Sequence, residues 1–150
     1  MTFVTHSSWF PVSADELYRF HADPRNLAKI SPPFPRLSLV GAAGVAQEGD
    51  VQDIRLSIGP LCVYWKARVT VVREGRLIED VQESGPFSRW RHQHRVAAER
   101  DGSCLTDAIA FRLLPTAAGE FVEYLLVRPA LIAMLAYRHR ATRRLLVAGG

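Results

Sequence analysis

Cysteine is scarce in this sequence, and its cysteines are not placed for a metal site or a disulfide framework. Cys62 and Cys104 both lie in strand-like segments, with no C-x-x-C motif and no Cys/His spacing of the kind that binds zinc. We expect both to be buried free thiols, as in proteins of a reducing compartment. The first residues also lack a basic stretch followed by an apolar one, so the sequence predicts no secretory signal and a cytoplasmic location.

Long uninterrupted apolar runs are also lacking. The longest, residues 121–137, contains Glu123, Arg128 and Pro129, whereas a membrane-spanning helix needs about 20 mostly apolar residues. The sequence has no glycine-rich dinucleotide motif and no G-x-S-x-G segment around a serine. It therefore predicts no membrane span, no nicotinamide site, no cofactor and no serine hydrolase.

Apolar residues are abundant, at 48% of the 150 residues, beside 23% charged residues. That balance is typical of a globular protein, and the length predicts one domain over residues 1–150. The net charge of +4 is concentrated in residues 137–144, YRHRATRR. Since cations in the last turns of a helix complement its dipole, and no aromatic stacking platform accompanies them, we expect a solvated helix face and no nucleic-acid partner.

The order of hydrophobic patterns predicts an α+β domain. A strand at residues 3–10 precedes a helix that begins after Ser13, its predicted N-cap, and ends at Asp23-Pro24. A second short helix is expected at residues 24–30. Strand-like segments then follow at hairpin spacing: residues 36–41, 50–59, 62–72, 76–82, 88–97 and 104–114.

Neighbouring strands in this series are joined by loops too short for a helical crossover, so they must pair antiparallel. After Pro115 the apolar period returns to that of a helix and predicts a long C-terminal helical region. Pro129 either kinks this region or occupies the first turn of a second helical segment. The single long helix is expected to cover one face of the sheet.

The strand at residues 88–97 departs from the usual pattern of aliphatic inner residues. With a period of two, an indole and two imidazoles share one face, since Trp90, His92 and His94 alternate with arginine and glutamine side chains. Because arginine is rarely buried, we expect the face with the aromatic rings to point toward the long helix. The two imidazoles then need polar partners in the interior.

One acid, Asp107, shares the inner face of the next strand with aliphatic residues. A two-residue turn at 101–102 would set His94 opposite Ile109 and diagonal to Asp107. A four-residue loop at 99–102 would set His94 directly opposite Asp107. Either register predicts a hydrogen bond or ion pair between His94 and Asp107, direct or through a water.

The element order, together with four sequence segments, resembles the START-like SRPBCC superfamily over essentially the whole chain. The segments are residues 14–35, 85–96, 105–115 and 134–146, and they are similar to a bacterial branch of polyketide cyclase/dehydrase-like ligand-binding proteins. The resemblance implies a helix-grip fold, in which a curved antiparallel sheet of six to seven strands wraps around a long C-terminal helix, with two short helices between strands one and two. Some relatives carry the domain fused to an NAD-dependent epimerase-like domain, so the resemblance also implies an epimerase-like protein as a partner.

Three interpretations of the inner face remain open. In the first, a cavity between sheet and helix binds a small hydrophobic or aromatic molecule, and polar side chains fix its orientation. The residues expected to contact that ligand are Trp65, Trp90, His92, His94, Asp107, Phe111 and Tyr124. In the second, a cyclase or dehydratase acts on a polyketide-like substrate, with His94 and Asp107 as catalytic residues that move a proton. In the third, the interior is filled, Asp107 only satisfies a buried imidazole, and the domain is a non-catalytic interaction module.

Other polar residues of the inner face receive no catalytic assignment. A metal site formed by His92, His94 and Asp107 would depend on the hairpin register, and we assign no metal. Asp80 lies either at the edge of the cavity or on a solvated rim. His21, a single histidine on an amphipathic helix, is given no role.

Overall fold

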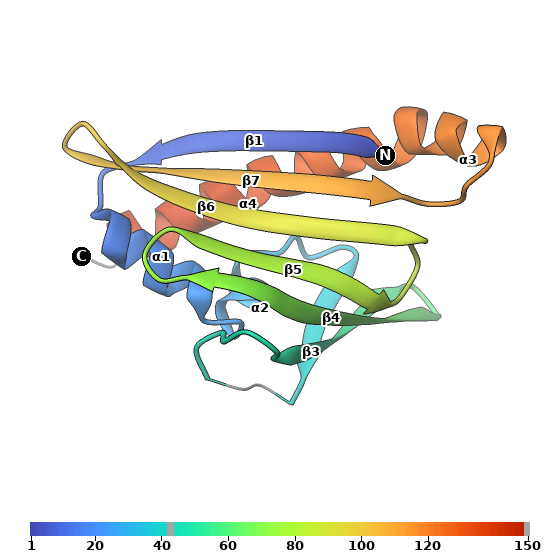
Figure 1. The fold of residues 1–150 in the computed structure, drawn as a ribbon, viewed down its shortest axis with the longest axis horizontal. Coiled ribbons are helices and arrows are strands. Elements are labelled where there is room, and N and C mark those ends of the chain that lie inside the picture. Colours follow the sequence, from blue (N-terminus) through green and yellow to red (C-terminus); the bar gives the residue numbers. More distant parts are fainter. Residues whose placement is uncertain (42–43, 149–150) are drawn as a thin grey trace.

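Antiparallel strands form one curved sheet in the computed structural model, which describes residues 1–41 and 44–148 (Figure 1). The seven strands follow the order β1-β7-β6-β5-β4-β3-β2 from one edge to the other. Their bounds are β1 Thr2–Phe10, β2 Arg36–Val40, β3 Val51–Ile58, β4 Leu61–Arg73, β5 Leu77–Ser84, β6 Arg89–Glu99 and β7 Gly102–Arg112. The predicted series of antiparallel hairpins is confirmed, and the first strand pairs with the last.

The helical segments lie on one side of this sheet (Figure 1). Two short helices, α1 Ala14–Ala22 and α2 Asn26–Ile30, connect β1 to β2. After β7 come α3 Ala117–Val122, the π-helical segment η1 Glu123–Val127 and the long helix α4 Arg128–Ala148. Figure 1 shows α4 running behind β1, β7 and β6. This arrangement confirms the predicted helix-grip fold.

The predicted helix boundaries agree with the observed ones where a capping residue or a proline sets them. Ser13 is the N-cap of α1, and its Oγ accepts a hydrogen bond of 3.1 Å from the backbone N–H of Glu16. Pro129 is the second residue of α4, but α4 follows η1 without a break, and the backbone is helical from Ala117 to Ala148. Pro129 therefore lies inside one helical region, directly after its π-helical turn, and not in the first turn of a separate segment.

A β-bulge changes which side chains of β4 face inward. A strict period of two along residues 62–72 predicts that Val69 and Val71 share the inner face, but the register with β5 shifts between these residues at Thr70. Val72, which lies opposite Ile78, packs against the buried core instead. The inward placement of Val71 was wrong because one extra residue in a strand reverses the faces that follow it.

Two apolar clusters pack between the sheet and the helices, and a polar layer separates them. On β7, Asp107 lies between Leu105 of the first cluster and Ile109 of the second. On β6, the two histidines lie between Val96 and Trp90, which again belong to different clusters. Since buried polar groups need partners, this layer is where the fold has to supply hydrogen bonds in its interior.

The two cysteines are free, as predicted, but they are not both buried. Cys62 is exposed and Cys104 is partly buried. Because Val63 and Trp65 face the interior, the alternation of β4 turns Cys62 to the outer face, where it accepts a hydrogen bond of 2.9 Å from Nε of Arg55. Within the described ranges of the chain, no helix is both long and apolar enough to cross a membrane.

Candidate functional site

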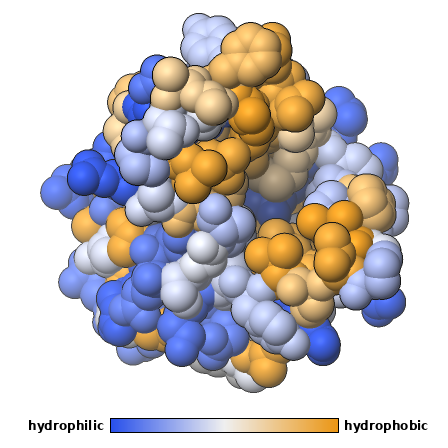
Figure 2. All heavy atoms as spheres, turned by 90° about the vertical axis from the view of Figure 1, so that its right-hand side faces the viewer, coloured by the Kyte–Doolittle hydropathy of each residue, from blue (hydrophilic) through white to orange (hydrophobic). Residues whose placement is uncertain are grey.

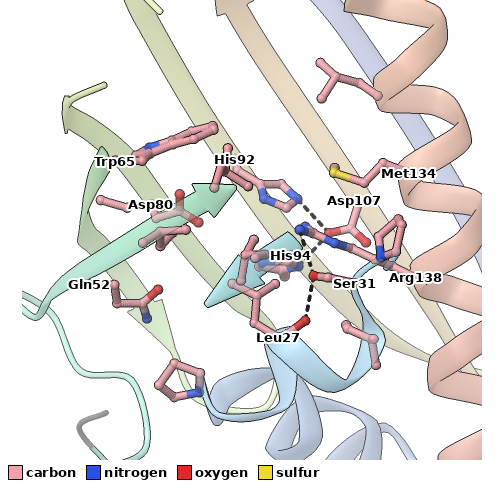
Figure 3. Close-up of a pocket in the computed structure, with 18 of the residues that line it drawn as sticks. Leu27, Ser31, Gln52, Trp65, Asp80, His92, His94, Asp107, Met134 and Arg138 are labelled. Carbon is pink, nitrogen blue, oxygen red and sulfur yellow. Dashed lines mark hydrogen bonds and ion pairs between the residues drawn. The ribbon is translucent and has the colours of Figure 1, made fainter. Parts of the chain in front are cut away.

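A cavity of about 770 Å³ lies between the inner face of the sheet and helices α2 and α4 (Figure 3). Small-molecule pockets are typically about 300–1,000 Å³ in volume and mostly apolar. Apolar side chains from both layers form most of its wall, among them Leu27, Ile54, Leu56, Val63, Leu131 and Met134. Figure 2 shows the molecule hollowed on one face, between two groups of hydrophobic side chains.

Asp107 on β7 is the centre of a buried polar network at the wall of this cavity (Figure 3). Its Oδ1 lies 2.8 Å from Nε2 of His92, and its Oδ2 lies 2.7 Å from Nε2 of His139. Nδ1 of His94 forms an ion pair with the same Oδ1 at 2.5 Å, although no hydrogen bond is aligned with that nitrogen. The predicted contact between His94 and Asp107 is confirmed.

The hairpin between β6 and β7 sets this geometry. Glu99 pairs with Gly102, and His94 lies directly opposite Asp107, as in the second of the two predicted registers. The turn between these strands contains Arg100, whose φ of 55° is left-handed. Tight hairpins need such positive φ values because they match the twist of the strands.

His139 on α4 is a partner of Asp107 that the sequence did not identify. Its side chain is buried, and its Nδ1 lies 2.8 Å from Oγ of Ser8 on β1. One imidazole therefore joins the long helix to two strands. Leu135, His139 and Thr142 are buried at a spacing of four and three residues, which is the pattern of an inner helix face. That spacing was the signal available in the sequence.

The network favours opposite charges on Asp107 and His94. Burial alone would raise the pKa of the Asp107 carboxyl, but the charge of His94 and the hydrogen bonds from the histidines lower it well below its usual range. For His94, burial acts to lower the pKa, and the nearby Asp107 carboxylate outweighs burial and raises it. Burial lowers the pKa of His92, so the neutral form of that imidazole is favoured.

Two more ionisable side chains line the cavity beside this network. Asp80 on β5 lies directly opposite His92 in the sheet, and burial raises the pKa of its carboxyl. Arg138 on α4 donates a hydrogen bond of 3.3 Å from Nη2 to Oγ of Ser31, and burial lowers its pKa. Asp80 is therefore at the edge of the cavity and not on a solvated rim.

His21 on α1 also belongs to the cavity wall, although no role was predicted for it. Its ring stacks against that of His94, with 5.6 Å between centroids. Burial, together with the charge of His94, lowers the pKa of His21 to about 3. The side chain is therefore neutral at physiological pH.

Several buried polar atoms of the cavity wall have no hydrogen-bond partner among the residues that the structure describes. They are Nε1 of Trp65, Nε of Arg138, Nε2 of His21 and Nδ1 of His94. The indole and guanidinium N–H groups can only donate. A buried donor without an acceptor costs about 1–3 kcal/mol. The indole N–H of Trp65 and the Nε–H of Arg138 are therefore buried donors without an acceptor in the described part of the chain, on residues that line the cavity.

Aromatic rings form one end of the cavity. Trp65 and Trp90 meet edge to face with 4.7 Å between ring centroids, and Phe87, which was not predicted, packs against both. Phe111 lies behind Trp90 in the apolar core and does not line the cavity. Tyr124 is 67% exposed on η1 and does not line it either. The other predicted contact residues line the cavity: Trp65, Trp90, His92, His94 and Asp107.

A second buried carboxylate lies at the far end of the sheet. Glu123 is fully buried at the start of η1, and its oxygens accept hydrogen bonds from Oγ1 of Thr2 at 2.6 Å and from the backbone N–H of Leu113 at 2.7 Å. Nε of Arg112 lies 3.7 Å from it. Glu123 does not line the cavity, so its role is to attach η1 to β1 and to the end of β7.

Comparison with protein families gives one match that covers most of the chain. A family model described as polyketide cyclase / dehydrase and lipid transport matches residues 10–135. No curated protein matches the chain.

Solved structures share the fold over nearly the whole chain. The Zhui aromatase/cyclase from Streptomyces sp. R1128 is 22% identical, with a TM-score of 0.64, over 99% of this chain and 98% of that one. A norcoclaurine synthase point mutant from Thalictrum flavum, in complex with a transition state analogue, is 19% identical, with a TM-score of 0.70, over 99% and 95% of the two chains. The major latex-like protein 151 from Panax ginseng is 13% identical, with a TM-score of 0.70, over 95% of each chain. At these identities the likeness concerns the fold alone.

Proposed function

The chain belongs to the polyketide cyclase/dehydrase and lipid transport family, within the START-like SRPBCC superfamily, and we propose that its cavity binds a small aromatic molecule that carries carbonyl or hydroxyl oxygens. The apolar wall supplies the affinity, because burial of apolar surface contributes about 25 cal/mol per Å². The aromatic end formed by Trp65, Phe87 and Trp90 offers ring faces and edges to a flat ligand.

The observation that carries this proposal is the set of unpartnered donors in a mostly apolar wall. The indole N–H of Trp65 and the Nε–H of Arg138 are buried and lack acceptors within the described residues. A purely aliphatic ligand would leave both unsatisfied, whereas a carbonyl or hydroxyl oxygen would accept from them. The proposed ligand class is therefore hydrophobic in most of its surface and oxygen-bearing at a few positions.

A matched pair of probes tests the ligand class. 2-Acetylnaphthalene and 2-ethylnaphthalene have nearly the same shape, and only the first has an acceptor oxygen. We expect the acetyl compound to bind about tenfold more tightly in equilibrium dialysis, since one satisfied hydrogen bond contributes about 1.4 kcal/mol. Equal affinities would contradict the role of the donors, and absence of binding for both would contradict the ligand-binding function.

Two tryptophan variants localise the effect. Trp65→Phe keeps an aromatic ring and removes the N–H, so it should reduce the advantage of the acetyl probe. Trp9→Phe is the matched control, because Nε1 of Trp9 already donates a hydrogen bond of 3.0 Å to the carbonyl of Glu99 and Trp9 does not line the cavity. A loss of the advantage in Trp9→Phe but not in Trp65→Phe would place the probe elsewhere.

A cyclase or dehydratase activity is the second candidate, and the pair of His94 and Asp107 at the cavity wall favours it. A carboxylate–imidazole pair is a common general acid–base couple. One similar structure, of limited sequence identity, is an aromatase/cyclase. On this proposal the bound polyketide-like substrate loses water as a ring closes, and His94 moves the proton.

The enzymatic candidate is tested with a synthetic linear β-polyketone that ends in an aryl group. Mass spectrometry follows the loss of water from the probe. His94→Gln and Asp107→Asn should abolish the loss of water catalysed by the wild type while the probe still binds. Turnover that is unchanged in both variants would contradict this assignment.

The interaction-module alternative depended on a filled interior, and the cavity beside His94 removes that support. We also propose a cytoplasmic location, since an exposed free thiol such as Cys62 suits a reducing compartment.

A further inference from the structure

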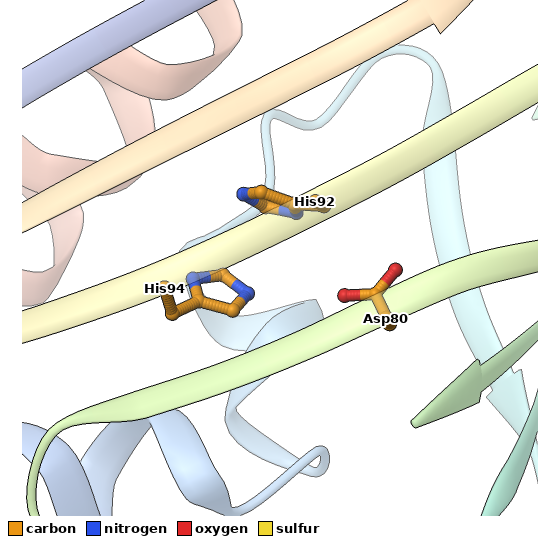
Figure 4. Close-up of side chains that lie close together, drawn as sticks. All are labelled: Asp80, His92 and His94. Carbon is orange, nitrogen blue, oxygen red and sulfur yellow. The ribbon is translucent and has the colours of Figure 1, made fainter. Parts of the chain in front are cut away.

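We propose that Asp80, His92 and His94 form a binding site for a divalent first-row transition metal ion in the wall of the cavity. Their potential ligand atoms all lie within 4.8 Å of one another. Figure 4 shows the Asp80 carboxylate reaching from β5 toward the imidazole rings on β6. This site goes beyond the binding of an organic ligand, because it needs none to form.

The sheet places these three side chains on the same surface. His92 and His94 alternate along β6, so both imidazoles point to the inner face. Asp80 lies directly opposite His92 in the antiparallel pairing of β5 with β6. Opposed residues have Cβ atoms about 5 Å apart, so the backbone register itself brings the carboxylate and both rings together.

Asp107 prepares both histidines as ligands. It engages Nε2 of His92 and Nδ1 of His94, which leaves Nδ1 of His92 and Nε2 of His94 for another partner. A carboxylate that accepts from one nitrogen of a neutral imidazole fixes the tautomer and leaves a lone pair on the other nitrogen, as is usual around metal-bound histidines. His94 is protonated when no metal is bound, so binding of the ion has to release the second proton of that ring. Asp107, which sequence analysis considered as a ligand, thus orients the two ligands and is not one itself.

Asp80 has no hydrogen-bond or ion-pair partner among the described residues, although it is only partly accessible. A carboxylate that is withdrawn from water without a partner is costly, and a cation between it and the two imidazoles would compensate for that cost. The guanidinium of Arg138 also lines the cavity and interacts electrostatically with both Asp107 and Asp80. Its positive charge opposes the binding of a cation. We therefore expect moderate affinity.

The ligand set selects the class of metal. Imidazole nitrogens suit zinc, cobalt, nickel and ferrous iron, whereas magnesium and calcium prefer sites made of oxygen atoms. Three protein ligands leave at least one coordination position open. Because all three residues line the cavity, the open position faces the space where an organic ligand would lie.

Titration with Co²⁺ alone tests the site in the untagged full-length chain after treatment with a chelator. We expect one Co²⁺ per chain, with visible absorption bands of the nitrogen- and oxygen-coordinated ion. Asp80→Asn, which keeps the shape of the side chain and removes its charge, should weaken binding at least about tenfold. Asp107→Asn should weaken it by about 10–100-fold through the orientation of the histidines.

Asp53→Asn is the matched control, because it makes the same change of side chain on β3, outside the cavity. The Asp53 carboxylate lies 3.8 Å from Nζ of Lys66. The affinity of this variant for Co²⁺ should equal that of the wild type. The absence of saturable binding at millimolar Co²⁺, or an unchanged affinity in a folded Asp80→Asn protein, would overturn the proposal. Since no organic ligand is present, either result leaves the ligand-binding proposal untouched.

Discussion

Asp107 and Glu123 are both fully buried carboxylates, and the difference between their surroundings separates a candidate site from a structural contact. The partners of Glu123 are a hydroxyl, a backbone N–H and an arginine, none of which changes its charge near neutral pH. The partners of Asp107 are imidazoles, the side-chain type whose ordinary pKa lies closest to neutral pH, and a cavity lies beside them. Burial of an acid therefore does not by itself indicate a functional site. A buried acid that lies beside titratable groups and a cavity does.

The comparison is sharpest if the two carboxylates are replaced by their amides. Asp107→Asn should destabilise the fold by about 3–5 kcal/mol at neutral pH, because it leaves a buried imidazolium without its counter-charge. Urea denaturation measures the change in the free energy of unfolding. A cost below about 1 kcal/mol would show that Asp107 and His94 are not the charged pair that the geometry indicates.

Glu123→Gln should cost less, about 1–3 kcal/mol at neutral pH, since the amide keeps the shape but weakens the bonds to Thr2 and Leu113. Burial alone would raise the pKa of Glu123, but those bonds and Arg112 hold it below the ordinary value of 4.5. A carboxyl whose pKa is lower in the folded protein stabilises the fold at pH values above its pKa in the unfolded chain. This contribution is lost as the pH falls through the pKa of the folded state.

The pH dependence of the unfolding free energy checks the sign of the pKa change at Glu123. The difference in unfolding free energy between wild type and Glu123→Gln should be constant near neutrality and should shrink as the pH falls below the ordinary glutamate value. A difference that grows on acidification would have the wrong sign for a lowered pKa. Ligand binding should be unaffected in this variant at neutral pH.

Trp90→Leu tests, through ligand binding, whether the cavity beside Asp107 is the binding site. It removes an aromatic surface from the cavity wall, and we expect 2-acetylnaphthalene to bind about tenfold more weakly, or about 1.4 kcal/mol. Equilibrium dialysis at matched temperature checks this. Unchanged affinity in a folded variant would place the probe away from the aromatic end.

Tyr124→Ala tests the region around Glu123, on η1, and should have the smallest effect. The side chain is exposed, and the guanidinium carbon of Arg128 lies 5.6 Å from its ring centroid. We expect stability to change by less than about 0.5 kcal/mol and probe affinity not to change. A loss of affinity like that of Trp90→Leu would restore Tyr124 to the binding site.

The sequence predicted the sheet well because its alternation is regular. The inward direction of Trp90 and His92 followed from the period of two, and Arg91 and Arg95 are exposed as that pattern requires. The inward direction of Val71 failed, since nothing local marks the bulge at Thr70. Local periodicity predicts faces only up to the first irregularity.

The site was predicted in part, and the missing residues have a common cause. His139 and Arg138 come from α4, and Ser31 follows α2, so their approach to β6 and β7 depends on how helices pack on the sheet. No short-range pattern contains that information. Tyr124 was misplaced for the same reason, because the π-helical segment η1 turns it outward.

The indole N–H signals of the protein in ¹⁵N–¹H NMR spectra test the central claim most directly. The chain has Trp9, Trp65 and Trp90, and only the last two line the cavity. Saturation with 2-acetylnaphthalene should shift the signals of Trp65 and Trp90 and leave that of Trp9 in place. If the signal of Trp9 moves alone, or none moves at saturation, the cavity between sheet and helix is not where such molecules bind.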